Sequence, residues 1–157
     1  MSRITRALCA LALLCAPLSS PLAAGGAVVH QAETSLEAAL DGLQAAILER
    51  GLYINNVLDL GEMFARTGAD LGFTEPVYGE ARSVEFCSAV LSREMMREDP
   101  TRIVNCPFVV SLYTLPDDPA TVHAAYRAIP AELQAASPVM REVAELLDAL
   151  ARAALAW

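Results

Sequence analysis

Apolar residues recur along the chain with two periods, one typical of helices and one typical of strands. Apolar side chains at every third or fourth position predict amphipathic helices, whereas short runs rich in β-branched and aromatic residues predict strands. The predicted helices span residues 34–50, 62–71, 89–99 and 138–156. The predicted strands span residues 27–32, 52–60, 84–87, 103–115 and 121–129. These elements indicate an α+β fold: a single sheet of about four to five strands with helices packed on it, plus an amphipathic C-terminal helix.

The starts of three helices carry residues that can cap free backbone amides. Thr34 and Glu37 have the spacing of a capping box, in which each side chain satisfies an amide of the first turn. Ser88 and Ser137 are predicted N-caps, and Pro138 suits the first helical position. The apolar face of the last helix has to be buried, either on this domain or on a second copy of the chain.

Two stretches are less regular. Residues 73–82 contain proline and glycine and are predicted to form a surface loop. Residues 121–129 are rich in alanine, which favours a helix, but their larger side chains alternate, and a tight turn at residues 116–120 precedes them. A tight turn after a strand usually returns another strand, so we predict a strand here.

The N-terminus has the pattern of a secretory signal peptide. Arg3 and Arg6 precede an apolar run at residues 7–18, which is too short to span a bilayer, and small residues follow it. We expect residues 1–25 to be removed by cleavage near Ala24. The protein is then expected in the periplasm or secreted, without a membrane span.

The net charge of the chain limits the classes of partner that we expect. The chain has a formal net charge of −8 and contains no lysine. Loss of Arg3 and Arg6 with the signal peptide would leave nine arginines against 19 acidic residues, a net charge of −10. An acidic domain of this kind is a poor ligand for nucleic acid or for an anionic membrane surface.

The central sequence resembles a known family. FCSAVLSREMM at residues 86–96, DPTRIVNCPFVVSLYTL at residues 99–115 and the strand at residues 122–127 are similar to secreted members of the domain-of-unknown-function 302 family. The resemblance implies an α+β fold and dimers. This family has no established activity, so it assigns no catalytic residue to the chain.

The resemblance covers residues 35–130. We therefore divide the chain into the signal peptide, an α+β domain at residues 27–130, and a C-terminal helical extension at residues 131–157.

Cys87 and Cys106 are the cysteines that remain after cleavage, and three interpretations are open for them. In an oxidising compartment, two cysteines in a small domain most often form a disulfide. Closing this loop would stabilise the fold by roughly 3 kcal/mol in the chain-entropy model.

The second interpretation is thiol–disulfide chemistry. Cys87 directly precedes a predicted helix, where the helix dipole favours the thiolate. Glu85 opposes this effect, and Cys106 is much farther away in the sequence than the second cysteine of a CxxC motif.

The third interpretation is a copper or haem site, because the chain contains soft and borderline ligands. These are Cys87, Cys106, Met95, Met96, His30 and His123. Their spacing matches no known ligand motif. We interpret the two methionines as core residues and His123 as a surface histidine with its hydrogen bonds satisfied, and we predict no cofactor.

Motifs for catalysis are missing from the sequence: it has no GxSxG, no phosphate-binding loop and no dinucleotide fingerprint. We therefore favour a non-catalytic periplasmic module that is stabilised by a disulfide and binds a small ligand or a partner protein, with a homodimer expected. The alternative is a periplasmic redox, metal-binding or haem-binding protein that uses Cys87 and Cys106.

Overall fold

The structure is a computed structural model that describes residues 26–157, so the expected signal peptide at residues 1–25 lies outside the described residues. Within this range the strands are β1 (Ala27–Glu33), β2 (Tyr53–Asp59), β3 (Ala81–Cys87), β4 (Phe108–Leu115) and β5 (Asp118–Arg127). The helices are α1 (Leu36–Glu49), α2 (Leu60–Leu71), α3 (Ala89–Glu98), the 3-10 helix η1 (Pro100–Asn105), α4 (Ala131–Ala136) and α5 (Pro138–Leu155).

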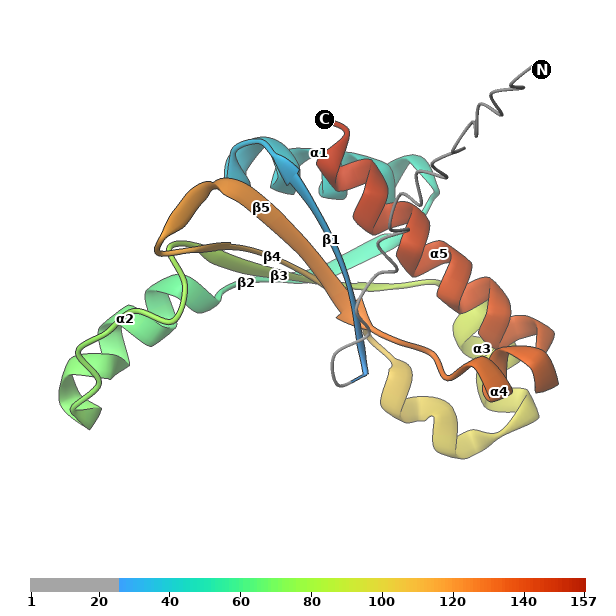
Figure 1. Ribbon diagram of the computed structural model, residues 1–157. Coiled ribbons are helices and arrows are strands. Elements are labelled where there is room, and N and C mark those ends of the chain that lie inside the picture. The colour runs from blue at the N-terminus through green and yellow to red at the C-terminus, as the bar shows by residue number, and fades with distance from the viewer. Residues whose placement is uncertain (1–25) are drawn as a thin grey trace, which may run out of the picture.

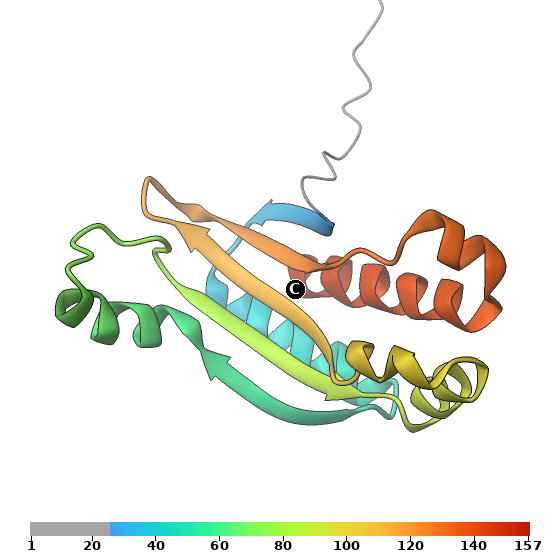
Figure 2. The ribbon, with the colours of Figure 1, turned by 90° about the horizontal axis from the view of Figure 1, so that it is seen from below.

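The strands form one antiparallel sheet in the order β1-β5-β4-β3-β2. Helices α1 and α5 lie against each other across one face of the sheet (Figure 1). Figure 2 looks onto the opposite face, which no described helix covers. This arrangement confirms the predicted α+β fold. Because α1 connects β1 at one edge to β2 at the other, the helix crosses the full width of the sheet.

The hydrophobic core lies between the sheet and the helices α1 and α5. Leu43 and Ile47 of α1 have no exposed surface, and the same holds for Val143 and Leu150 of α5. These side chains belong to one cluster with the inward-facing residues of the strands. Each such burial contributes about 1.5–3 kcal/mol of hydrophobic free energy. The apolar face of the C-terminal helix is therefore buried on its own chain.

The first turn of α1 differs from the predicted capping box. The N-cap is Ser35, whose hydroxyl accepts a hydrogen bond from the Ala38 amide at 3.1 Å. Thr34 belongs to the sheet side of this turn, because its amide donates to the Ala120 carbonyl. The prediction of Thr34 as the capping residue was therefore wrong by one position.

The other two predicted caps are confirmed. The Ser88 hydroxyl accepts a hydrogen bond from the Leu91 amide at the start of α3. The Ser137 hydroxyl accepts one from the Met140 amide at the start of α5, directly before Pro138.

The strand predicted over residues 103–115 was wrong in its first part, which belongs to η1. Asp99 caps this 3-10 helix by accepting hydrogen bonds from the amide and the hydroxyl of Thr101, and Pro100 occupies its first position. The strand β4 begins only at Phe108. The apolar run therefore bends at one end of the sheet before it enters the sheet.

The strand predicted at residues 121–129 is confirmed as β5, although it starts and ends earlier, at Asp118 and Arg127. Its core-facing side chains, such as Val122 and Ala124, have no exposed surface. Pairing with β4 and β1 on its two sides therefore outweighs the helical preference of its alanines.

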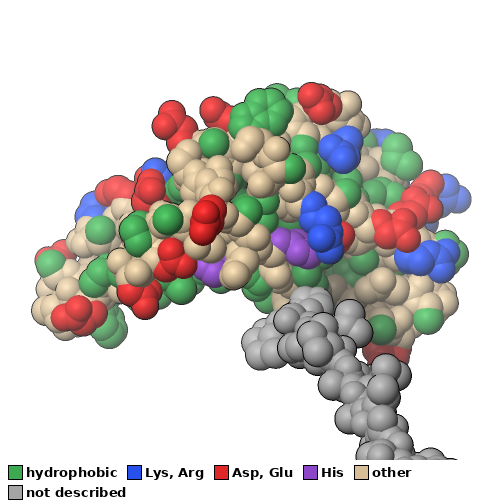
Figure 3. Space-filling view, turned by 45° about the horizontal axis from the view of Figure 1, so that its top comes forward, with side chains coloured by type: hydrophobic (Ala, Val, Ile, Leu, Met, Phe, Trp, Pro, Cys, Tyr) green, Lys and Arg blue, Asp and Glu red, His purple; other side chains and the backbone are tan. Residues whose placement is uncertain are grey.

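Helix α2 and the loop that follows it, residues 60–79, form an arm that projects from the body of the protein (Figures 1 and 2). No residue of α2 is buried. The arm exposes large apolar side chains, and Figure 3 shows hydrophobic side chains among acidic ones along it. These exposed residues are Met63, Phe64, Leu71, Phe73 and Val77.

Among the described helices, none is both long enough and apolar enough to cross a membrane.

Candidate functional site

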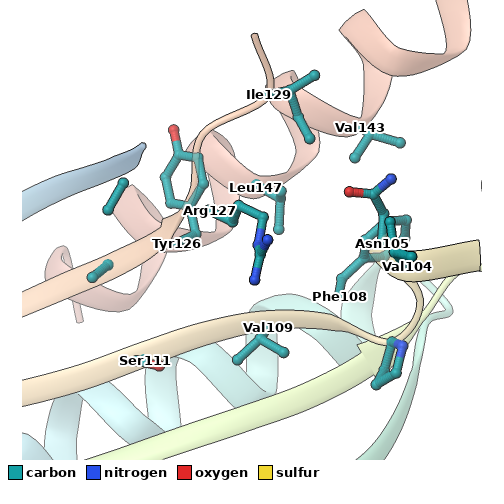
Figure 4. Close-up of a pocket in the computed structure, with 13 residues that line it drawn as sticks. Val104, Asn105, Phe108, Val109, Ser111, Tyr126, Arg127, Ile129, Val143 and Leu147 are labelled. Carbon is teal, nitrogen blue, oxygen red and sulfur yellow. The ribbon is translucent and has the colours of Figure 1, made fainter. Parts of the chain in front are cut away.

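Strands β4 and β5 separate at one end of the sheet and leave a cavity between them. Their pairing begins with Val110 opposite Tyr126, so the residues beyond this pair do not meet across the gap. The cavity has a volume of about 380 Å³ (Figure 4). Its walls come from β1, η1, β4, β5, the segment after β5, and α5. Small-molecule sites typically have volumes of about 300–1,000 Å³, so the cavity is large enough for a small ligand.

The inner wall of this cavity is apolar. Val143 and Leu147 of α5 line it, together with Phe108 and Ile129, and all four side chains are buried. Val143 and Leu147 face the cavity because the gap between the strands reaches the sheet-facing side of α5. Val104 of η1 also lines the cavity, but it is 80% exposed, so it lies at the entrance.

Arg127 provides the cationic group of the cavity. Figure 4 shows its side chain extending from β5 into the space between the two strands. Within residues 26–157, no carboxylate oxygen lies within 4.0 Å of its guanidinium nitrogens. Asn105 adds an amide, whose nitrogen donates a hydrogen bond to the Arg102 carbonyl at 3.2 Å. The cavity therefore combines apolar walls with a guanidinium that has no carboxylate partner in the described part of the chain.

A second hollow of about 630 Å³ continues from the same region toward the outside. It shares Ala27, Asn105, Arg127 and Ile129 with the inner cavity. Arg127 thus lies where a largely apolar space joins a more open one, and there it can meet the polar end of a ligand held in the inner space.

Cys87 and Cys106 lie close together beside this cavity. Cys87 ends β3, and Cys106 lies between η1 and β4, with the two Sγ atoms 3.6 Å apart and the thiols unbonded. Asn55 donates a hydrogen bond to the Cys87 Sγ at 3.1 Å, and the Ser92 Oγ lies 3.6 Å from the Cys106 Sγ. A disulfide has an S–S bond of about 2.05 Å, so the sulfurs would move toward each other by about 1.5 Å to form one.

The environment of Cys87 opposes formation of a thiolate. Burial raises the pKa of the Cys87 thiol, and the neighbouring Cys106 and Glu85 raise it further, while the hydrogen bond from Asn55 opposes them. The position before α3 therefore does not produce the low pKa that a nucleophilic cysteine needs.

The cysteine pair and the cavity share one chain segment. Asn105 and Pro107, on either side of Cys106, both line the cavity. A bond between Cys106 and Cys87 would therefore fix the segment that forms one wall.

The other candidate ligands have different surroundings in the structure. Met95 has no exposed surface in the core, and Met96 packs against the same core. His30 lies on β1 and His123 on β5. Among residues 26–157, no group of three or more His, Cys, Asp or Glu side chains is arranged to hold a metal ion.

His123 differs from the prediction of a histidine with satisfied hydrogen bonds. Its ring stacks on Tyr113, with centroids 4.8 Å apart and planes at 10°. In this position the Nε2 atom is buried and has no hydrogen-bond partner among the described residues. That part of the prediction was wrong, because stacking on a neighbouring strand determines the position of the ring.

His30 belongs to a polar cluster that joins the sheet to α5. The Asp148 Oδ1 atom lies 2.8 Å from the His30 Nε2 and accepts a hydrogen bond from the Tyr126 hydroxyl at 3.1 Å. The Asp148 Oδ2 atom accepts a hydrogen bond from the Arg152 Nε at 2.7 Å. The pair of Asp148 with Arg152 is local, since the two residues are four apart on α5, whereas the other two contacts come from distant strands.

The arm contains a larger hollow, of about 740 Å³, between α2 and its own loop. All its walls come from residues 61–79, which pack little on the rest of the fold. Because a single projecting segment forms this hollow, we place the candidate ligand site in the cavity between β4 and β5, whose walls belong to the body of the protein.

Comparisons with known proteins were made for the whole chain. The family model described as "Domain of unknown function DUF302" matches residues 28–156, a range that extends past residue 130 and includes α5. The crystal structure of an uncharacterized conserved protein DUF302 from Bacillus stearothermophilus has a TM-score of 0.66 at 11% identity, covering 83% of this chain and 99% of that chain. No curated protein matches the chain. The matched range and the shared fold show that this chain belongs to the DUF302 family.

Proposed function

We propose that this protein is a secreted or periplasmic binding module that holds a small ligand in the cavity between β4 and β5 and does not catalyse a reaction. The observation that carries this proposal is the cavity itself, which has buried apolar walls and one cationic side chain. Apolar walls with a few polar groups at fixed positions are typical of small-molecule sites. The signal peptide expected from the sequence supports the location.

A disulfide between Cys87 and Cys106 is part of this proposal. The 3.6 Å separation of the two sulfurs supports it, because a small side-chain movement would bring them to bonding distance. In an oxidising compartment the bond would hold η1 and the start of β4 against the end of β3, and so support one wall of the cavity.

The alternative function, a redox or metal protein that uses these cysteines, receives less support. The raised pKa of Cys87 disfavours nucleophilic thiol chemistry. Copper or haem iron would need further ligands near the two thiols, whereas Met95 is enclosed in the core and His123 stacks on Tyr113.

Binding of the neutral fluorescent probe N-phenyl-1-naphthylamine tests the proposed function. We expect saturable binding with one site per chain, because the probe is apolar and of a size that suits the cavity. Val109 lines the cavity and is 37% exposed, so Val109→Trp should fill the space without disturbing the core. This substitution is expected to weaken binding at least tenfold.

The matched control is Val90→Trp, which places the same side chain at an exposed position on α3, outside the cavity. It should leave probe binding unchanged. Absence of saturable binding, or equal binding by the Val109→Trp and unmodified proteins, would contradict the proposal.

A second function is favoured by a separate observation, the exposed apolar surface of the arm. Helix α2 has no buried residue, and the adjacent edge strand β2 exposes Tyr53, Val57 and Leu58. We propose that a second copy of the chain covers this surface, since an antiparallel edge strand can pair with its own copy about a two-fold axis. The dimer expected from the family resemblance supports this choice of partner.

A further inference from the structure

We propose that the ligand of the cavity is a small amphiphile with a single carboxylate head and an apolar tail. This inference rests on the proposed binding function and specifies its ligand class. The tail would lie in the inner cavity between β4, β5 and α5. The head would meet the guanidinium of Arg127 where the inner and outer hollows join.

The guanidinium of Arg127 identifies the head group. A planar guanidinium binds a carboxylate or phosphate oxygen pair through two parallel hydrogen bonds. Four arginines form ion pairs with carboxylates in the described part of the chain, namely Arg66, Arg82, Arg102 and Arg152. Among the described arginines that have no such ion pair, Arg127 is the one that lines the cavity. Arg127 instead extends toward apolar walls, where an anion supplied by a ligand can pair with it.

The buried apolar residues at the inner end of the cavity indicate the kind of tail that the ligand carries. Val143 and Leu147 form its inner end, and Phe108 and Ile129 flank it. The polar side chains that line the cavity, Asn105, Ser111, Tyr126 and Arg127, are committed elsewhere or lie nearer the rim. The Ser111 hydroxyl pairs with that of Ser83 at 2.6 Å, and the Tyr126 hydroxyl donates to Asp148. An apolar tail therefore leaves no polar group of this inner end without a partner.

The charge around the cavity limits the head group to one negative charge. Glu85 on β3 lies directly opposite Val109 of β4, on the same side of the sheet. The chain as a whole carries a net charge of −8. A phosphate monoester with two charges would meet more repulsion here than a carboxylate with one.

Displacement of N-phenyl-1-naphthylamine at neutral pH compares the head groups on one tail. Octanoate should displace the probe at a concentration roughly tenfold lower than 1-octanol, because only the carboxylate pairs with the guanidinium. Octyl phosphate should displace the probe less well than octanoate. Binding of octanoate is also measured directly by calorimetry.

Arg127→Gln should abolish the preference for octanoate over 1-octanol while probe binding remains. Arg127 is exposed, so this substitution is not expected to unfold the protein, and Arg127→Lys should keep part of the preference. The matched control is Arg141→Gln, which removes an exposed arginine of α5 outside the cavity and should leave the preference unchanged.

The possible results separate the two proposals. Equal displacement by octanoate and 1-octanol, stronger displacement by octyl phosphate, or a preference that survives Arg127→Gln would overturn the ligand class while the binding function stands. If the unmodified protein neither binds the probe nor takes up octanoate, the binding function fails and the ligand class fails with it.

Discussion

Asp148 shows how one side chain can link elements that are distant in the sequence. Burial raises the pKa of its carboxyl group, but hydrogen bonds from Arg152, His30 and Tyr126 outweigh burial and hold the pKa below its ordinary value. Burial raises the pKa of the Tyr126 hydroxyl, and the negative charge of Asp148 and the hydrogen bond to it raise this pKa further, while Arg152 opposes them. The carboxylate thus connects α5 to both β1 and β5.

Asp148→Asn is expected to lower the free energy of unfolding at neutral pH by about 1–2 kcal/mol, since charge-assisted hydrogen bonds are lost at a partly exposed site. Because the pKa of Asp148 is lowered in the folded state, its stabilisation is present above the unfolded pKa and is lost as the pH falls through the folded pKa. The difference between variant and unmodified protein should therefore shrink below about pH 4. Urea unfolding of both proteins from neutral pH to below about pH 4 measures this difference in stability.

Glu145→Gln provides the control on the same helix, at an exposed position. It should change the stability by less than about 0.5 kcal/mol. A difference for Asp148→Asn that stays constant from pH 7 to acid pH would contradict the electrostatic origin of the effect.

Single residues were predictable from the sequence where the signal is local. Ser88 and Ser137 were identified because a cap and its helix are adjacent in the sequence. Arg127 was missed, because it is one of several arginines in the sequence and only the separation of β4 from β5 places it at a cavity. Alternation along β5 indicates that Arg127 and the buried Tyr126 face opposite sides, but it does not reveal a gap.

At the scale of elements, the arm is the clearest exception to burial of apolar surface. A helix of 12 residues without a buried side chain is marginal by itself in water, so contact with a partner would stabilise it. Phe64 and Leu71 are 43% and 68% exposed, and both line the hollow of the arm.

The variant with Phe64→Glu and Leu71→Glu is expected to shift a dimer to monomers in sedimentation velocity, because two charges would then lie in the proposed interface. The stability of the monomer should change by less than about 1 kcal/mol, since neither side chain is buried. Val90→Glu on α3 is the control and should leave the association unchanged. A dimer that persists in the double variant would exclude the arm as its interface.

Helices α1 and α5 meet closely at Gly42. A Cβ atom at this position would lie 2.6 Å from the Trp157 Cβ and 3.3 Å from the Ala154 carbonyl oxygen. The buried glycine therefore allows the end of the chain to pack on α1.

Gly42→Ala is expected to reduce the stability of the full chain by about 1 kcal/mol or more, although alanine favours a helix by about 1 kcal/mol over glycine. In a chain that ends at residue 155, the same substitution should reduce the stability less, because the contact with Trp157 is removed while that with the Ala154 carbonyl remains. Thermal unfolding of the four proteins in this cycle measures the coupling. Equal effects of the substitution in both chains would show that Trp157 does not restrict this position.

Periodicity predicted the elements well where one side of an element is buried. Helices α1 and α5 and strand β5 follow their apolar patterns, since the core is on one side of each. The strand prediction for residues 103–105 was wrong because the apolar run continues from the 3-10 helix η1 into the strand β4. Asp99 and Pro100 are a local signal for the start of η1, but they equally suit the end of the helix predicted at residues 89–99.

For the whole molecule, the oxidation state of Cys87 and Cys106 tests the expected location most directly, because a disulfide is expected in an oxidising compartment. Protein isolated from an oxidising compartment should have a mass lower by two hydrogens than the dithiol form, and should accept two alkyl groups only after reduction. Replacing both cysteines with serine should lower the free energy of unfolding by roughly 3 kcal/mol.

Reduced, unmodified protein should match the double serine variant in stability. Two thiols that react with the alkylating reagent before reduction would contradict the disulfide.

The order of the strands in the sheet could not be predicted from the sequence. The sequence pattern predicts each strand separately. It does not predict that β1 pairs with β5, or that α1 connects β1 to β2 at the opposite edge of the sheet. Strand pairing depends on contacts between residues that are far apart in the chain, and no local pattern records them. The cavity is a product of this order, since it forms where two neighbouring strands part.

The start of β1 also has a consequence for maturation. Gly26 and Ala27, the first two residues that the structure describes, line the outer hollow, so the described chain begins beside the ligand site. The proposed cleavage near Ala24 would leave the new N-terminus within a few residues of Gly26 in the sequence. A purification tag for the binding experiments is therefore better placed at the C-terminus than directly before Gly26.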